Sequence, residues 1–197
     1  MAGALSWTCV EESVMPVSEQ TYERVALEDP DGHWELVCGR LRRKPGMTFE
    51  HYGAARMLVH LLNLQLDVRD FVIDKDGPRL RISTGTYFIP DVCVISRTLF
   101  ERRRQELPRG FEMYEEPMPL VVEVWSPSTG EYDVEEKLRE YQWRGDLEIW
   151  RIHPYEKTLT RWQHQPDGSY HESSQRGGAA RPATLPNVSI DLNSLFA

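Results

Sequence analysis

Apolar residues recur every three or four positions over residues 50–66 and 131–143, which is the spacing of one buried face of an α-helix. A shorter helix is expected over residues 18–27, because the cap-type Ser18 comes directly before acidic residues. Residues 1–17 are expected to form a flexible N-terminal arm, since they show little periodicity. The remaining residues, 18–197, have a length that fits one domain.

Strands are predicted where short runs of apolar and β-branched residues lie between turn residues. Two such runs, 33–37 and 41–44, meet around Gly39 and predict a hairpin. Helices and strands in this order predict an α/β protein, in which a mixed sheet is flanked by helices and carries an N-terminal helix and hairpin. Further strands are expected at 71–73, 79–82, 87–89, 92–95, 120–125, 147–152 and 159–162, and residues 185–196 are expected to end the chain as a strand or loop with a final docking turn.

Composition narrows the class of protein. Of the 197 residues, 40% are hydrophobic and 27% are charged, which is an ordinary profile for a globular chain in water. No apolar run is long enough to cross a membrane, and residues 1–7 lack the features of a secretory signal. Cys9, Cys38 and Cys93 are widely spaced and odd in number, so we expect reduced thiols in a cytoplasmic protein.

The net charge of −8 is unfavourable for broad, non-specific attraction to nucleic acid. Two basic clusters, residues 40–44 and 102–104, interrupt this acidity. A charge cluster of this kind is most simply interpreted as a solvated face. Charge alone therefore counts against a DNA-binding protein without excluding a local basic path.

Two acidic residues stand in or beside strands that are otherwise apolar. Glu123 lies within the run 120–125, and Asp91 lies between Pro90 and the run 92–95. A lone carboxylate is costly to bury, so acids in such positions are usually paired or bind a metal ion.

A cation site is one explanation of these two acids. Two carboxylates, together with the nearby backbone carbonyl of Val124, are oxygen ligands of the kind that Mg²⁺ or Mn²⁺ prefers. The alternatives are structural, because Asp91 could cap a turn and Glu123 could pair with an arginine.

Lys137 borders the inward-facing stripe of the helix over residues 131–143. A lysine in that position either extends its stem past the edge of the core or reaches a buried acid. Because this helix directly follows the strand of Glu123, it must pack back onto the sheet, which favours a contact between Lys137 and the buried acid.

These residues stand in an order that resembles the Uma-type restriction endonucleases, a bacterial family within the PD-(D/E)XK nuclease superfamily. The resemblance covers roughly residues 18–196. Its most specific part is the Glu-Val-x-Ser-Pro-Ser-Thr segment that begins at Glu123, whereas Pro-Asp alone would be a weak signal. The matching motifs are Trp34–Gly39, His51, Pro90–Asp91, Val121–Thr129, Lys137, Tyr141 and Glu148–Pro154.

The resemblance implies a restriction endonuclease-like fold and a magnesium-dependent DNA endonuclease. Asp91 and Glu123 would hold Mg²⁺ or Mn²⁺. The third motif position, usually a lysine, is Trp125 in this chain. The resemblance implies that Lys137 supplies the missing amine from the following helix.

Three further residues have roles that the sequence leaves open. Glu35 would add a catalytic acid near the cleft, or it would face solvent from the hairpin. His51 faces the site or caps the helix that begins near it. Trp125 packs against the second long helix, stacks on a base or sugar of the substrate, or narrows the cleft.

The sequence favours one function and leaves two alternatives open. The first is a metal-dependent DNA endonuclease, which as a relative of dimeric nucleases is expected to form a homodimer. The second is a catalytically silent protein that keeps the fold as a binding or assembly module, as the acidic charge and Trp125 suggest. The third is a metal-dependent hydrolase of a small phosphoester. The intact set of Asp91, Glu123 and Lys137 favours the first.

Overall fold

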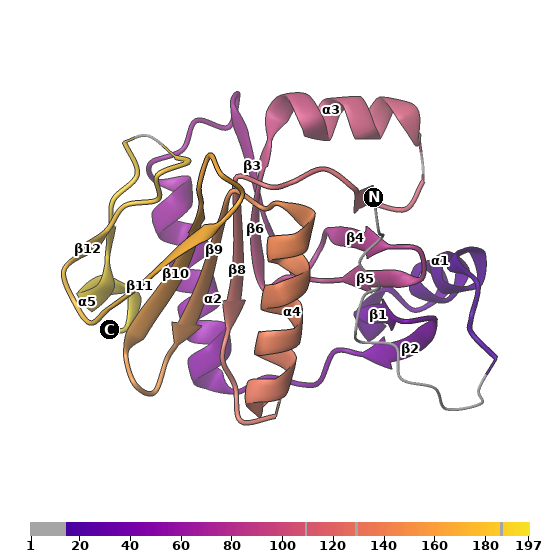
Figure 1. The fold of residues 1–197 in the computed structure, drawn as a ribbon, viewed down its shortest axis with the longest axis horizontal. Helices are drawn as coiled ribbons and strands as arrows, with labels where there is room; N and C mark the ends of the chain where they lie inside the picture. Colours follow the sequence, from indigo (N-terminus) through magenta and orange to yellow (C-terminus); the bar gives the residue numbers. More distant parts are fainter. Residues whose placement is uncertain (1–14, 109, 129, 186) are drawn as a thin grey trace.

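A computed structural model describes residues 15–197 of the chain, with the exception of residues 109, 129 and 186. Two mixed sheets form the frame of this part (Figure 1). The larger sheet has six strands in the order β11 (Tyr170–Gln175), β10 (Thr158–His164), β9 (Glu148–His153), β8 (Leu120–Val124), β6 (Val92–Ser96) and β3 (Phe71–Lys75). The smaller has five in the order β2 (Arg40–Arg43), β1 (Trp34–Val37), β5 (Thr86–Phe88), β4 (Arg79–Ser83) and β7 (Met113–Tyr114).

The longer helices cover the larger sheet, while the smaller sheet lies beside it. Helices α2 (Phe49–Asn63) and α4 (Gly130–Arg144) lie on opposite faces of the larger sheet (Figure 1). Helix α1 (Glu19–Glu28) packs on the smaller sheet, and α3 (Arg97–Glu106) follows β6 directly. The remaining elements are the 3₁₀ turn η1 (Pro30–Gly32), the strand pair β12 (Ala179–Ala180) and β13 (Ile190–Asp191), and helix α5 (Leu192–Leu195).

The predicted α/β class with an N-terminal helix and hairpin is confirmed. The helices expected at 18–27, 50–66 and 131–143 are α1, α2 and α4, although α2 ends at Asn63. Ser18 caps the start of α1, because its side-chain oxygen accepts a hydrogen bond from the backbone N–H of Thr21. Each predicted strand is present. Strand β11 lies at the edge of the larger sheet and is not predicted, since its polar sequence lacks an apolar alternation.

Strand β8 is the structural centre of the larger sheet, and all five of its residues are buried. Side chains alternate across it, as the sequence predicts. Val122 and Val124 enter the core beneath α2, which includes Leu58, whereas Val121 enters the opposite core, which includes Tyr141 of α4. Glu123 therefore projects from the same face as Val121, into the layer that contains α4.

The strand register brings the two predicted acids together. Strands β6 and β8 are antiparallel, with Val92 opposite Val122. Asp91 therefore lies next to Glu123 at the end of this ladder, on the same face of the sheet. Strands β8 and β9 are parallel, so α4 is the crossover that connects them across that face.

Two further expectations concern the cysteines and the N-terminal arm. Cys93 is a free, buried thiol, but Cys38 is disulfide-bonded, so the prediction of three reduced cysteines is wrong. The arm expected over residues 1–17 falls mostly outside the described residues. In the part of the chain that is described, no helix is long and apolar enough to cross a membrane.

The packing of α2 on the larger sheet yields a stability prediction. Leu58 is fully buried in this core, whereas Leu64 at the end of the same helix is 69% exposed. Leu58→Ala should lower the free energy of unfolding by about 2–5 kcal/mol, because it leaves a cavity. Leu64→Ala is the matched control and should change it by less than about 0.5 kcal/mol. Urea unfolding measures both, and equal losses in the two variants would contradict this packing.

Candidate active site

The carboxylate of Asp91 is buried, and its two oxygens have different surroundings. Oδ2 accepts a hydrogen bond from the backbone N–H of Val124 at 2.6 Å and lies 3.0 Å from Nε2 of His51. Because an ionised carboxylate can only accept, Nε2 of His51 must carry the proton of that contact. Oδ1 lies 2.7 Å from Nζ of Lys44 but has no aligned hydrogen bond. The scaffold thus holds Oδ2, while Oδ1 faces a cation.

Glu123 meets two side chains that lie one turn apart on α4. The hydroxyl of Tyr141 donates a hydrogen bond to Oε1 at 2.7 Å, and Nζ of Lys137 lies 3.3 Å from the same oxygen. Nζ of Lys137 also lies 2.8 Å from Oε1 of Glu35, which accepts a hydrogen bond from the backbone N–H of Ile89 at 2.8 Å. Lys137 therefore points to the buried acids and bridges the two sheets.

Two residues of the site were not anticipated as such. Lys44 follows β2, and its Nζ donates a hydrogen bond to Oδ1 of Asp76 at 2.7 Å while contacting Asp91. Its side chain is only 7% exposed, so the solvated face expected for residues 40–44 is wrong for this lysine. Asp76 lies after β3 in the left-handed region, with φ of 55°, and its other oxygen pairs with Lys75.

Burial and neighbouring charge move the protonation equilibria of the two central acids in opposite directions. Burial tends to raise the pKa of Asp91, but the Lys44 ammonium and the His51 hydrogen bond hold it well below its usual range. Burial raises the pKa of Glu123 to about 7, against the attraction of Lys137, and the nearby Asp91 charge adds to this rise. At neutral pH, Asp91 is therefore fully ionised, whereas Glu123 is partly protonated.

The two lysines of the site stay protonated. Burial tends to lower the pKa of Lys44, but Asp91 and Asp76 raise it above its ordinary value. Burial acts in the same way on Lys137, and there Glu123 and Glu35 raise the pKa. Both side chains are therefore ammonium ions at neutral pH.

The site contains more carboxylates than buried ammoniums. The two buried ammoniums, of Lys44 and Lys137, are faced by four carboxylates: Glu35, Asp76, Asp91 and Glu123. Lys75 lies at the more exposed rim. Among the described residues, no three acidic, histidine or cysteine side chains converge on one point as a complete metal cage. A cation bound here would take part of its coordination from backbone oxygen and water, as Mg²⁺ commonly does.

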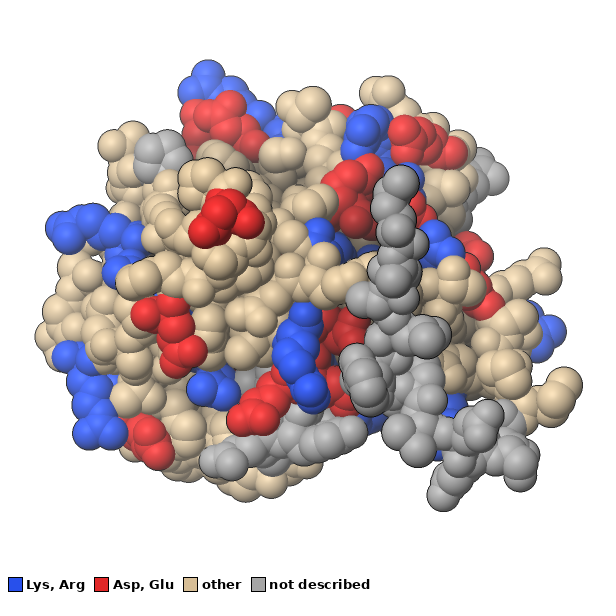
Figure 2. Space-filling view, viewed as in Figure 1, with Lys and Arg blue, Asp and Glu red and all other residues tan. Residues whose placement is uncertain are grey.

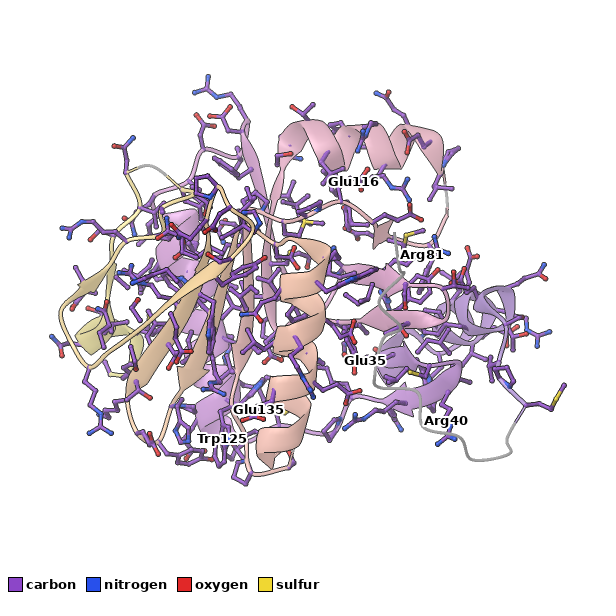
Figure 3. All side chains as sticks on the ribbon, viewed as in Figure 1. Glu35, Arg40, Arg81, Glu116, Trp125 and Glu135 are labelled. Carbon is purple, nitrogen blue, oxygen red and sulfur yellow. The ribbon has the colours of Figure 1, made fainter. Side chains whose placement is uncertain are left out.

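Trp125 lies at the other flank of α4. Its ring stacks on His153 of β9, with ring centres 4.3 Å apart and planes at 17°. Both rings line an open hollow of about 1020 Å³, which also touches Glu135 and holds none of the four acids. Figure 3 shows Trp125 and Glu135 near the lower end of α4 and Glu35 beyond the opposite side of the helix. This hollow is thus separate from the acid cluster.

The sequence model of the Uma2 family, described as "Putative restriction endonuclease", matches residues 19–193. This chain belongs to the Uma2 family. The match confirms the predicted family resemblance. None of the curated proteins matches the chain.

A solved structure shares the fold of this Uma2 protein. It is titled as a putative nuclease belonging to DUF820 from Anabaena variabilis, and the two chains superpose with a TM-score of 0.67. The alignment covers 83% of this chain and 89% of the other, at 17% sequence identity. At this identity the likeness establishes the fold, and the predicted nuclease-like architecture is confirmed.

The arginine cluster over residues 102–104 of this Uma2 protein is neutralised by neighbouring glutamates. Each arginine in the cluster 102–104 pairs with a glutamate: Arg102 with Glu116, Arg103 with Glu106 at 2.9 Å and Arg104 with Glu101 at 3.6 Å. Figure 2 shows basic and acidic side chains interspersed on the face that contains α4. The expected solvated face is confirmed for Arg102 and Arg104, whereas Arg103 is 18% exposed and donates a hydrogen bond to the backbone carbonyl of Met113.

The structure brings together the four side chains that the sequence nominated as catalytic. Asp91, Glu123, Lys137 and Glu35 form one connected cluster. His51 lies in the first turn of α2, where its backbone N–H bonds to the side chain of the cap residue Thr48, and its ring contacts Asp91. Of the two alternatives, His51 therefore faces the site, and the helix cap is Thr48. Lys44 and Asp76 are the additions.

The raised pKa of Glu123 makes the stability of the metal-free protein depend on pH. A neutral Glu123 stabilises the fold fully below about pH 4.5, and this stabilisation is lost as pH rises through about 7. In chelator, Glu123→Gln should therefore gain stability relative to the natural protein between pH 5 and 8, by up to about 3 kcal/mol. Glu135→Gln, on the exposed side of α4, is the control and should follow the natural protein. Parallel pH curves for all three would show that Glu123 is not held neutral.

Proposed function

We propose that this Uma2 protein is a metal-dependent DNA endonuclease that hydrolyses phosphodiester bonds. The observation that carries the proposal is the convergence of Asp91, Glu123 and Lys137 at one end of the β6–β8 ladder. The family match supports nuclease activity, and the polarity of the cluster supports the cation.

The oxygen atoms of the site fit a hard divalent cation. Oδ1 of Asp91 is buried, has no aligned hydrogen bond and already faces a positive charge. The backbone carbonyl of Val124 faces the same strand as its N–H, which bonds to Asp91, so it points toward the acids. Asp91, Glu123 and Val124 would hold Mg²⁺ or Mn²⁺. Such an ion, when bound, supplies a Lewis acid and lowers the pKa of a water molecule.

Lys137 would stabilise negative charge rather than remove a proton. Its pKa is raised by Glu123 and Glu35, so at neutral pH it has no free electron pair with which to act as a base. Glu35 and the carbonyl of Ile89, at 2.8 and 3.4 Å from Nζ, fix its position. A fixed ammonium beside the reacting phosphate is a preorganised electrostatic stabiliser.

The other side chains would orient the acids. Val124 and His51 fix Oδ2 of Asp91 and so leave Oδ1 for the cation. The pKa of Tyr141 is raised well above its ordinary value, by burial and by the Glu123 charge, so its hydroxyl stays a donor to Oε1. Because Glu123 is partly protonated near pH 7, binding of a cation to its carboxylate would release that proton.

Two expectations concern the assembly and the location of the protein. The homodimer stays part of the proposal, on the resemblance to related nucleases. A cytoplasmic location also stays part of the proposal, and the disulfide of Cys38 is the observation that weighs against it, because such bonds are rare in that compartment.

A catalytically silent binding protein is the second candidate. The specific observation in its favour is that lysines already neutralise the acids, Lys44 at Asp91 and Lys137 at Glu123. The net charge of −8 and the paired arginines also favour it over an enzyme that tracks the DNA backbone.

Nicking of supercoiled plasmid DNA decides between the two candidates. The natural protein should nick it with Mg²⁺ or Mn²⁺ and not with excess chelator. Asp91→Ala should lower the rate by at least about a hundredfold, because it removes a cation ligand. Asp167→Ala, at an exposed turn after β10, is the control and should retain full activity. DNA binding without metal-dependent nicking would support the silent protein instead.

A further inference from the structure

Lys44 occupies the place that a cation needs. Its backbone N–H donates to the carbonyl of His33 at 3.1 Å, which extends the hairpin by one residue and directs the side chain inward. The ammonium lies 2.7 Å from Oδ1 of Asp91, and the side chain is almost fully buried. Burying an ammonium is costly, because the group loses its solvation by bulk water. The inward position of Lys44 therefore depends on the acids that it meets there.

A divalent ion and the Lys44 ammonium cannot both hold Asp91. Oδ2 is already bonded to the N–H of Val124 and to His51, so Oδ1 is the oxygen that remains for a cation. A magnesium ion binds carboxylate oxygen at about 2.1 Å. An ammonium beside the same oxygen would lie within a few ångströms of the ion, and two positive charges at that range repel strongly in a buried site.

The surroundings of Lys44 provide a second position for it. Its aligned hydrogen bond goes to Asp76, whereas its contact with Asp91 is an ion pair without hydrogen-bond alignment. The Asp76 side chain is 15% exposed and that of Asp91 only 2%. A position of Lys44 beside Asp76 alone would therefore keep this hydrogen bond and lie nearer to solvent.

We propose that Lys44 is the resident counter-ion of the metal-free site, which a divalent cation must displace from Asp91 onto Asp76. Lys44 thereby stabilises the empty site and sets a lower metal affinity than the carboxylates alone would give. The inference rests on the proposed metal-dependent function, and it concerns a residue that neither the family match nor the motifs nominate.

Manganese affinity of the Lys44→Met variant tests the proposal. Free Mn²⁺ is measured by electron paramagnetic resonance during titration at pH 8, where Glu123 is largely ionised. Without its competitor, the variant should bind Mn²⁺ at least about tenfold more tightly than the natural protein, and Mn²⁺ should raise its Tm by more. Lys75→Met is the matched control, because Lys75 pairs with the same Asp76 from the rim. It should change the affinity by less than about threefold.

Lysine reactivity gives a second test that needs no variant to fold. The chain has four lysines, Lys44, Lys75, Lys137 and Lys157, so acetylation of each can be followed by mass spectrometry. Lys157 is exposed and serves as the internal reference. Saturating Mg²⁺ should raise the reactivity of Lys44 several-fold relative to Lys157 and leave Lys137 protected. Unchanged protection of Lys44 with Mg²⁺ bound would overturn the proposal.

The outcomes separate this inference from the proposed function. If the natural protein binds Mn²⁺ and Lys44→Met binds it equally or more weakly, the counter-ion proposal fails and the metal-dependent nuclease remains. If neither protein binds Mn²⁺, both proposals fail. If Lys44→Met and Lys75→Met gain affinity equally, the effect is a general loss of positive charge, and the specific role of Lys44 is rejected.

Discussion

The buried carboxylate of Asp91 is the constraint on which the arrangement of this protein depends. A charge in that position is stable only when donors and counter-charges surround it. Three separate elements supply them: the N–H of Val124 from β8, the ring of His51 from α2, and the ammonium of Lys44 after β2. The larger sheet, its main helix and the hairpin of the smaller sheet are thus joined at one anionic group.

The surroundings of Glu123 show how a crossover helix can supply the lysine that the strand lacks. Trp125 continues the face of Glu123 but turns to stack on His153, away from the acids. The parallel pairing of β8 with β9 forces the chain to cross the sheet through α4, and this places Lys137 and Tyr141 over Glu123. Lys137 thus reaches the site from the crossover helix and not from the strand that contains Glu123.

The predictable part of the structure is the part with a strong periodic signal. The helical stripes and apolar strands identified the central elements, and the cost of burying Asp91 and Glu123 pointed to the site. Lys44 was missed because it ends an arginine-rich run, and a local charge cluster does not reveal which member turns inward. Asp76 was missed since it lies in a charged turn between two predicted strands, where acids are usually solvated, and its place depends on a left-handed backbone conformation. Strand β11 was missed because it pairs with β10 at the sheet edge through backbone hydrogen bonds, which do not require apolar side chains.

Anomalous diffraction from crystals soaked in manganese would show whether Asp91 is the centre of a cation site. We expect one peak at about 2.2 Å from Oδ1 of Asp91, with Glu123 and the carbonyl of Val124 as further ligands and Lys44 moved onto Asp76. A peak elsewhere in the molecule, or Lys44 still in contact with Asp91 when manganese is bound, would contradict this expectation.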